Sequence, residues 1–423
     1  MGKSETITAL RKKITKILFL LLLVRLGLYI PIPNIDLDIF SQGSTSNNMF
    51  GFARTLTGSS FLGVGSLGIL PYINASIIIQ ILTPIFPNLE RLQKEEGELG
   101  RQQISRYTRY LTFIWAIVLS TIVAFVLVKP VIFNWSLKQA LQIIFSLTAG
   151  SMLSMWFSEL ITEEQLGNGS SMLIFINIVG GIPNSFNELN KLFTNASYFE
   201  NLIKIIQGFG IYSFLVLIVI FFQDAYKRID IVSAKQLNLD YSEQSQFKAK
   251  LKNSYIPIKL NLGGIMPLVF SSTVATFLYY PVQLLINSDY GKTFSFLPNF
   301  VAFYSFALNI TLVIFFSCFY AVLVLKPEDI SQNLAKMAYT IPGIRQGKQT
   351  TNYLENTVSR LSFMGGLFLA FLAFFPLLIG NVFQFNLFKN VTSLLILIGV
   401  ITDVTSQIRG YLIARNYEGL KSP

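Results

Sequence analysis

The sequence predicts an all-α membrane protein with ten transmembrane helices. Of its 423 residues, 52% are hydrophobic and only 13% are charged, whereas soluble proteins carry roughly 25% charged residues. Ten apolar runs approach the length of about 20 residues that a bilayer-spanning helix needs. A polar stretch at 184–204 separates the first five runs from the last five. This is the layout of an internal inverted repeat, so we expect two pseudo-symmetric halves, 1–204 and 205–423.

The predicted spans follow one another through the chain. The first begins in a basic segment that resembles a signal peptide, but Leu28-Tyr29-Ile30-Pro31 stands where a cleavage site would lie. We therefore interpret it as a retained span. The fifth and tenth runs are short, but they fit a bundle with tilted or partly exposed helices. The ten runs are 17–33, 67–87, 110–129, 139–161, 171–183, 205–223, 262–286, 302–325, 361–380 and 390–407.

The distribution of lysine and arginine predicts the orientation. An even number of spans puts both termini on the same side of the membrane, and the loops on that side carry 25 of the 33 lysines and arginines. The opposite loops carry only 7. Because basic loops stay on the cytoplasmic side, both termini should face the cytoplasm or its equivalent.

Two loops on the basic side, 224–261 and 326–360, are longer than a connector needs. With the net charge of +11, they allow two interpretations. The first is positive-inside topology together with attraction to anionic lipid. The second is a docking surface for an acidic or RNA-bearing partner. Composition alone favours the first interpretation.

Residue types that catalysis commonly needs are missing. The chain has no histidine and a single cysteine, Cys318, which removes the commonest general base, the commonest metal ligand and any intrachain disulfide. The Gly-rich segments 180–183 and 262–267 lack the lysine of a phosphate-binding loop. We therefore expect no catalytic site, no metal site and no cofactor.

Apart from Lys129 at the end of its run, three charged residues fall within the predicted spans: Arg25, Glu159 and Asp403. Glu159 and Asp403 lie near the cytoplasmic ends of their spans, which favours a packing role. Arg25 lies deeper and should face protein or water, so a structural hydrogen bond and a functional role are both open. A small-solute transporter needs several ion ligands near the midplane, and Arg25 alone is a poor supply.

The second span contains polar residues in a regular pattern. Its sequence, SLGILPYINASIIIQIL, places four residues at i, i+4, i+7 and i+11, close to one face of a helix: Ile69, Ile73, Ser76 and Gln80. Pro71 suits the first helical turn, where its missing N–H costs little. The face changes from aliphatic to polar toward the cytoplasmic end. This indicates a helix that borders a water-accessible path.

The segment 49–65, MFGFARTLTGSSFLGVG, precedes that span. It is weakly apolar, rich in small residues and too irregular to cross the membrane. Non-helical backbone at membrane depth occurs only where it is buried in protein or lines a cavity. From these residues alone, an ordinary external loop and a re-entrant piece are both open.

Four motifs occur in order beside or within the predicted spans. They are LGILPYINASIIIQILT at 67–83, EEGELGRQQISRYTRYLT at 95–112, ITEEQLGNGSSMLIF at 161–175 and KPEDISQNLAKMAYTIPGIRQGKQT at 326–350. With these motifs, the sequence resembles the SecY family of protein-conducting channels. The resemblance implies an hourglass pore between two five-helix halves, a lateral gate formed mainly by spans 2, 3, 7 and 8, and a re-entrant plug near 49–65.

In this family a ring of aliphatic side chains forms the waist of the pore. The resemblance places that ring at Ile69, Ile73, Ile174, Val269 and Ile396, and it places Ile77 and Gln80 at the lateral gate. A sixth ring position falls on Ser170, so either the ring has five members or Met172 or Leu173 completes it. Aliphatic side chains at a narrow waist hold back ions without binding a passing polypeptide strongly.

The resemblance also implies the function and the partners. The chain would be a channel subunit without catalysis of its own, which moves unfolded, signal-bearing preproteins and releases hydrophobic segments sideways into lipid. Energy would come from the SecA motor ATPase or the ribosome, and SecE with a SecG-like subunit would complete the channel. Anionic lipids are a further expected partner. The implied docking residues are Arg345, Lys348, Lys227, Arg228, Lys248 and Lys250.

Composition suggests the compartment. The chain is slightly short for the family and rich in Ile, Asn, Phe and Lys, a bias typical of AT-rich genomes. We therefore expect a plastid-encoded member of the family from an alga, in the thylakoid membrane. A bacterial plasma membrane is the alternative.

Overall fold

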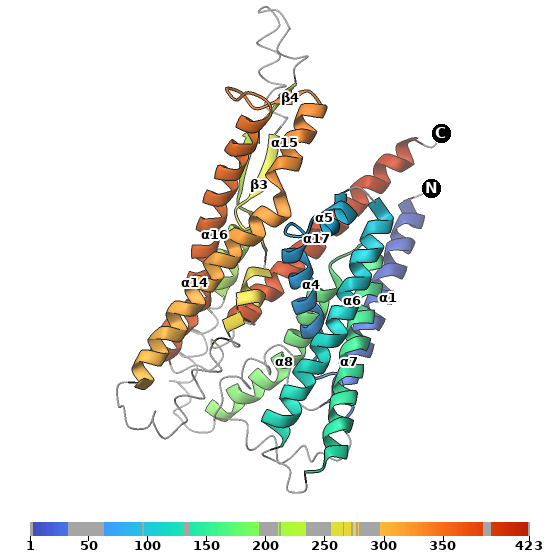
Figure 1. The fold of residues 1–423 in the computed structure, drawn as a ribbon, viewed down its shortest axis with the longest axis vertical. Coiled ribbons are helices and arrows are strands. Elements are labelled where there is room, and N and C mark those ends of the chain that lie inside the picture. The colour runs from blue at the N-terminus through green and yellow to red at the C-terminus, as the bar shows by residue number, and fades with distance from the viewer. Residues whose placement is uncertain are drawn as a thin grey trace, which may run out of the picture. The chain divides into compact units, whose positions relative to one another are not determined.

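The computed structural model shows a helical chain, with two small β-sheets among the residues that it describes (Figure 1). The predicted plug near 49–65 lies outside the described residues except for its last three, and Lys248 and Lys250 lie outside them too. The structure describes residues 3–32, 63–94, 97–129, 135–193, 210, 213–233, 255–264, 266–271, 274–275, 278, 297–383 and 391–421.

The chain divides into two compact units, and each is described by itself. Unit 1 comprises Met1–Tyr198 together with Ile396–Pro423, and unit 2 comprises Phe199–Leu395. The pseudo-symmetry of the two halves stays a prediction.

Unit 1 is built from helices. They are α1 (Lys3–Tyr29), α4 (Leu70–Leu82), α5 (Pro87–Lys94), α6 (Gly97–Ile122), the π-helical continuation η1 (Val123–Val128), α7 (Leu137–Glu163), α8 (Gly169–Phe193) and most of α17 (Val391–Lys421). α6 packs against both α4 and α7, and it runs beside α7 (Figure 1). α7 begins at a capping box, in which the side chains of Ser136 and Gln139 accept hydrogen bonds from each other's backbone N–H groups.

The chain is a membrane protein with several apolar helices. Among the described residues, five helices are long and apolar enough to cross a membrane, or six if the bent pair α4 and α5 counts as one span. That pair bends by 104° at its break. The count of ten spans stays a prediction, because 205–223 and 262–286 are described only in part.

Several helices are longer than the apolar runs that predict them. α8 continues to Phe193, beyond the run 171–183, and α6 begins at Gly97 rather than near residue 110. α16 (Lys348–Phe383) likewise begins before residue 361. Hydropathy detects only the part of a helix that is apolar enough for the membrane interior, so the polar turns at helix ends escape it.

The backbone just before α4 is held against the end of α1. The N–H of Val64 donates to the Ile30 carbonyl at 2.9 Å. The N–H of Gly65 donates to the Gly27 carbonyl at 3.1 Å. These bonds pair backbone groups that are costly to leave unpaired inside a membrane.

Glycines allow this close approach. A Cβ on Gly63 would collide with the Leu28 carbonyl, and a Cβ on Gly150 of α7 would collide with the Val64 carbonyl. A buried apolar cluster joins the end of α1, η1 and α7 to the segment that leads into α4: Ile32, Leu67, Ala124, Val128, Ile143 and Leu147. The chain therefore enters α4 along a single tight path between α1 and α7.

Unit 2 combines helices with the two sheets. Its elements include the short helix Ser213–Asp224, α14 (Leu297–Leu325), α15 (Pro327–Lys336), α16, β1 (Tyr226–Asp230), β2 (Val232–Ser233), β3 (Tyr255–Lys259) and β4 (Tyr339–Thr340). α14 and α16 pack along each other. β1 pairs with β3, and β2 pairs with β4, both antiparallel. The second pairing joins the predicted loops 224–261 and 326–360 to each other.

Substituting Gly150 by alanine tests the tight path into α4. In an unconstrained helix interior this change stabilises a protein by up to about 1 kcal/mol. Here the methyl group meets the Val64 carbonyl, so we expect destabilisation of about 1–3 kcal/mol, the usual cost of overpacking. The measurement is thermal unfolding in detergent, followed by fluorescence that includes Trp135, which packs on the adjoining cluster.

Gly410→Ala in α17 is the matched control, since a Cβ there meets nothing within 4 Å. That variant should be as stable as the parent chain or slightly more so. A Gly150→Ala chain that unfolds at the control's temperature would contradict the tight path.

Candidate functional site

One face of α4 carries an aliphatic-to-polar stripe, formed by Ile69, Ile73, Ser76 and Gln80. This stripe changes from buried to exposed along the helix. Ile69 and Ile73 are each only 3% exposed, whereas Gln80 is exposed and donates to the Ser76 hydroxyl at 3.4 Å. Ile77 is half-buried. Pro71 lies in the first turn of the helix, as its sequence position predicts. α4 therefore presents an aliphatic start and a polar end on one face.

A short turn sets the position of Ile69. The N–H of Gly68 donates to the Gly65 carbonyl at 2.8 Å, and Gly68 has a φ of +51°, which glycine adopts without strain. Beside Gly68 lies the Asn177 side chain of α8, which is 3% exposed. Its Oδ1 has no hydrogen-bond partner among the described residues.

The start of α8 explains what Ser170 does. The backbone N–H and the hydroxyl of Ser170 both donate to Asn168 Oδ1, at 3.1 and 2.8 Å. The N–H of Gly169 donates to the Thr162 hydroxyl of α7 at 2.9 Å. These side chains satisfy the first N–H groups of α8, which have no partner within the helix. The Ser170 hydroxyl is therefore used in the N-terminal cap of α8, one turn before Ile174.

The five predicted ring residues are all buried aliphatic side chains. Those of unit 1 are Ile69, Ile73, Ile174 (4% exposed) and Ile396 (6% exposed), and that of unit 2 is Val269 (2% exposed). Met172 and Leu173 are buried as well. A ring that draws on both units stays a prediction.

Arg25 has a structural partner within unit 1. Its Nη2 donates to the Gly180 carbonyl of α8 at 2.9 Å, and its guanidinium lies 5.6 Å from the Tyr29 ring centroid. A Cβ on Gly180 would collide with the guanidinium. The glycine therefore leaves room for the arginine, and the hydrogen bond ties α1 to α8.

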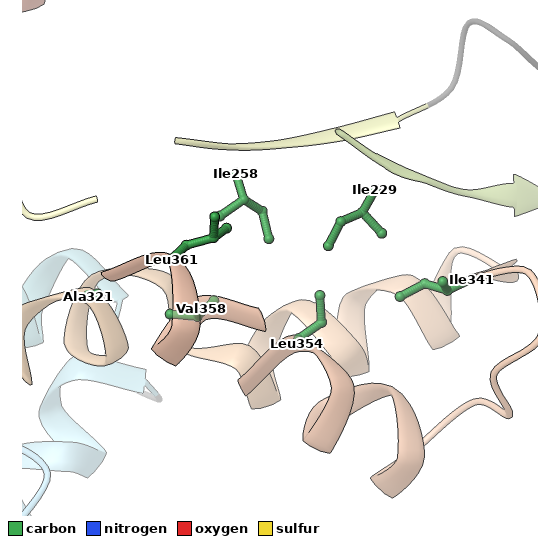
Figure 2. Packing of buried hydrophobic residues seen from close by; sticks show 7 residues of the cluster. All are labelled: Ile229, Ile258, Ala321, Ile341, Leu354, Val358 and Leu361. Carbon is green, nitrogen blue, oxygen red and sulfur yellow. The ribbon is translucent and has the colours of Figure 1, made fainter. Parts of the chain in front are cut away.

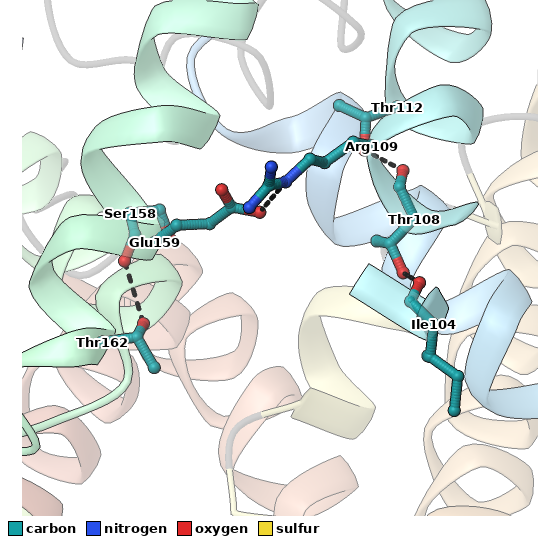
Figure 3. Close-up of polar contacts among 7 residues, drawn as sticks. All are labelled: Ile104, Thr108, Arg109, Thr112, Ser158, Glu159 and Thr162. Carbon is teal, nitrogen blue, oxygen red and sulfur yellow. Dashed lines mark hydrogen bonds and ion pairs between the residues drawn. The ribbon is translucent and has the colours of Figure 1, made fainter. Parts of the chain in front are cut away.

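Polar contacts also join α6 to α7. Arg109 Nε donates to Glu159 Oε1 at 3.0 Å, in a partly exposed ion pair (Figure 3). Such pairs contribute little net stability, and the packing role of Glu159 stays a prediction. The Thr108 and Thr112 hydroxyls donate to backbone carbonyls one turn earlier in α6, at 2.9 and 2.7 Å. They bury polar groups without leaving them unpaired.

The sequence does not predict one polar cluster of unit 1. Lys13 of α1 donates to the Glu164 carbonyl at 3.0 Å and lies 5.4 Å from the Tyr411 ring centroid of α17. Lys16 forms an ion pair with the Glu164 carboxylate. The partners lie far apart in the sequence, and no spacing rule relates them. The cluster ties the N-terminal helix to the turn before α8.

The two long predicted loops share an apolar core in unit 2. Because successive side chains of a strand point to opposite faces, β1 and β3 turn aliphatic side chains toward α16 (Figure 2). α14 contributes Ala321 to the same cluster. Leu354 of α16 is only 1% exposed. The buried members are Ile229, Ile258, Ala321, Ile341, Leu354, Val358 and Leu361. The two loops thus form one structural unit, in which the antiparallel ribbon of β1 and β3 packs on α16. We call this unit the ribbon platform.

The predicted docking residues that the structure describes all lie exposed on this unit. Lys227 and Arg228 belong to β1. Arg345 precedes α16, and its carbonyl accepts a hydrogen bond from the Thr350 hydroxyl at 2.8 Å. Lys348 begins the helix. Within the described ranges, no three Cys, Asp or Glu side chains gather as metal ligands.

The chain is similar to known proteins along nearly its whole length. The SecY family model matches residues 64–405. The Emiliania huxleyi protein named "Protein translocase subunit SecY" is 67% identical over 422 residues, which cover 100% of both chains.

Solved structures share the fold. "The structure of a protein conducting channel" superposes with a TM-score of 0.64 at 16% identity, and covers 93% of this chain and 90% of the other. "Sec61 in the Canine ribosome-channel complex from the endoplasmic reticulum" gives 0.62 at 15% identity, with coverage of 96% and 94%. The family match and the near-identical length of the Emiliania huxleyi relative lead to one conclusion: the chain belongs to the SecY family.

Proposed function

We propose that this chain is the central protein-conducting channel of a Sec translocase. It passes unfolded, signal-bearing polypeptides across the membrane and releases hydrophobic segments sideways into lipid. Membership of the SecY family over residues 64–405 carries the proposal, because that interval contains all five predicted ring positions. The relative in Emiliania huxleyi is named a protein translocase subunit, and one solved structure with the same fold is that of a protein-conducting channel.

The proposed seal is the ring of five aliphatic side chains: Ile69, Ile73, Ile174, Val269 and Ile396. Each is at most 6% exposed, and none offers a hydrogen bond to an ion or a passing chain. A narrow aliphatic waist dewets and blocks ions, yet it releases a polypeptide readily. The use of the Ser170 hydroxyl in the cap of α8 favours a five-membered ring.

Two further parts complete the proposed channel. The plug near 49–65 closes the resting pore, and the hydrogen bonds of its last residues with α1 give it a fixed attachment. The lateral gate includes Ile77 and Gln80 of α4, whose half-buried and exposed positions suit a surface that parts for a signal peptide.

The proposed source of energy is a partner that docks on the ribbon platform. Arg345, Lys348, Lys227 and Arg228 lie exposed on unit 2, and basic side chains attract an acidic or RNA-bearing surface. We assign SecA as the motor, with SecE and a SecG-like subunit as channel partners. A ribosome is a second docking partner, since the canine Sec61 of the same fold is part of a ribosome-channel complex. Anionic lipid surrounds the basic face.

The proposed location is the thylakoid membrane of an algal plastid, with both termini on the stromal side. The 67% identity to the Emiliania huxleyi protein supports an algal origin. The excess of lysine and arginine in the loops beside the termini supports the orientation.

Serine at both Ile69 and Ile73 should make the resting channel leak ions. Hydroxyl groups at the waist allow water to enter, and wetting removes the barrier to ions. The measurement is single-channel conductance of the purified chain in planar bilayers without a substrate. Ile78→Ser is the control, because Ile78 lies in α4 off the stripe. Unchanged conductance of the double variant, with both proteins folded, would count against the ring.

Arg345→Glu should abolish SecA-driven translocation while folding and insertion persist. The substitution reverses the charge of an exposed residue and turns attraction for an acidic partner into repulsion. Protease-protected preprotein in reconstituted vesicles gives the readout. Lys336→Glu reverses an exposed charge at the end of α15 and should retain most of the activity. Full translocation by the Arg345→Glu chain would remove Arg345 from the docking surface.

A further inference from the structure

Arg228 does not extend freely from the ribbon platform. Its Cζ lies 5.3 Å from the Tyr226 ring centroid and 5.0 Å from the Tyr255 ring centroid. Its Nη2 donates to the Tyr226 hydroxyl at 2.8 Å. The two rings stack with centroids 6.4 Å apart and planes inclined by 10°. One arginine is thus held by two tyrosines that come from different strands.

The register of the ribbon creates this cluster. Tyr226 stands opposite Lys259 at one end of the paired segment, and Tyr255 stands opposite Asp230 at the other. Arg228 lies between them, on the face away from buried Ile229, because successive side chains of a strand point to opposite faces. The apolar face is anchored in the core of the platform, so the polar face is presented by a supported ribbon.

The contacts prepare Arg228 to bind. A free arginine side chain carries about 2 kcal/mol of rotamer entropy, and restricting it in advance lowers the cost of association. A guanidinium has five N–H donors, and the hydrogen bond to Tyr226 uses one of them. The same bond lowers the pKa of the Tyr226 hydroxyl, because the guanidinium donates to the phenol oxygen. The remaining edge of the guanidinium matches a carboxylate.

We propose that Tyr226 and Tyr255 are positioning residues that hold Arg228 to bind a carboxylate on a partner protein. The inference rests on the proposed docking function of the ribbon platform and names the chemistry of its partner. Tyrosine and arginine are enriched, together with tryptophan, among the residues that dominate binding energy at protein interfaces. Here they form one cluster on a ribbon whose other face packs in the apolar core of the platform.

Charge on the same face favours a protein over RNA. The face of Arg228 carries Lys259 opposite Tyr226 and Asp230 opposite Tyr255, so its charge is mixed, and Asp230 contributes to the electrostatic environment of Arg228. A phosphate backbone carries dense negative charge and needs several cations to neutralise it, so Asp230 would oppose it. A protein partner can pair a cation with Asp230 while its carboxylate meets Arg228. Mixed charge of this kind fits a complementary protein surface.

The test is a double-mutant cycle on the full-length chain in lipid nanodiscs, with purified SecA as the probe. Arg228→Ala and Tyr255→Leu should each weaken SecA binding by about fivefold or more, a loss that only a minority of interface residues cause when truncated. The double variant should bind no more weakly than Arg228→Ala alone, because the tyrosine acts through the arginine. Tyr226→Phe keeps the ring and should cause a smaller loss than Tyr255→Leu.

Lys227→Ala is the matched control, since it removes one positive charge from the same strand on the opposite face. Its effect should add to that of Tyr255→Leu. Thermal unfolding should be unchanged in all variants. A U20 RNA is the second probe, and its affinity should be insensitive to Tyr255→Leu.

Additive losses from Arg228→Ala and Tyr255→Leu would overturn the proposal, as would losses seen with U20 RNA and not with SecA. If Arg345→Glu weakens SecA binding and the ribbon variants do not, docking stands and this inference fails. If Arg345→Glu also leaves SecA binding intact, the docking function itself fails.

Discussion

The close backbone contact between 63–65 and the helices α1 and α7 is the constraint on which unit 1 depends. It exists because Gly63 and Gly150 have no Cβ to separate the chains, and because the N–H groups of Val64 and Gly65 donate to backbone carbonyls at the end of α1. Because these contacts hold the chain where it enters α4, the turn before α4 has a single position. The position of Ile69, at the start of the aliphatic stripe, follows from it.

Unit 2 shows how loops of a membrane protein gain a defined surface. The ribbon of β1 and β3 is short, and an isolated two-stranded ribbon is marginally stable in water. Burial of its aliphatic face on α16 supplies the stabilisation that strand pairing lacks. The opposite face is then free to present Arg228 and its two tyrosines in a fixed arrangement. A basic loop thus becomes a surface with specific chemistry.

Polar groups inside unit 1 follow one rule, which is that each is paired with a neighbouring polar group wherever the packing allows. Arg25 reaches the Gly180 carbonyl, and Ser170 closes the cap of α8. Asn177 and Ser151 are exceptions, since Asn177 Oδ1 and the Ser151 hydroxyl have no partner among the described residues. Polar residues of the helices therefore act in two ways: Arg25 joins two helices, whereas Ser170 completes a cap within one helix.

The sequence by itself determined the membrane class, most helix centres, the family resemblance and the aliphatic-to-polar stripe of α4. These features depend on composition and on local periodicity, which are legible within a few residues. Only the tertiary structure decided that the two long loops share a core, that Lys16 meets Glu164 and that Arg228 rests on Tyr255. Such contacts join residues far apart in the chain, and their geometry depends on strand register and on close backbone packing, which no local pattern encodes.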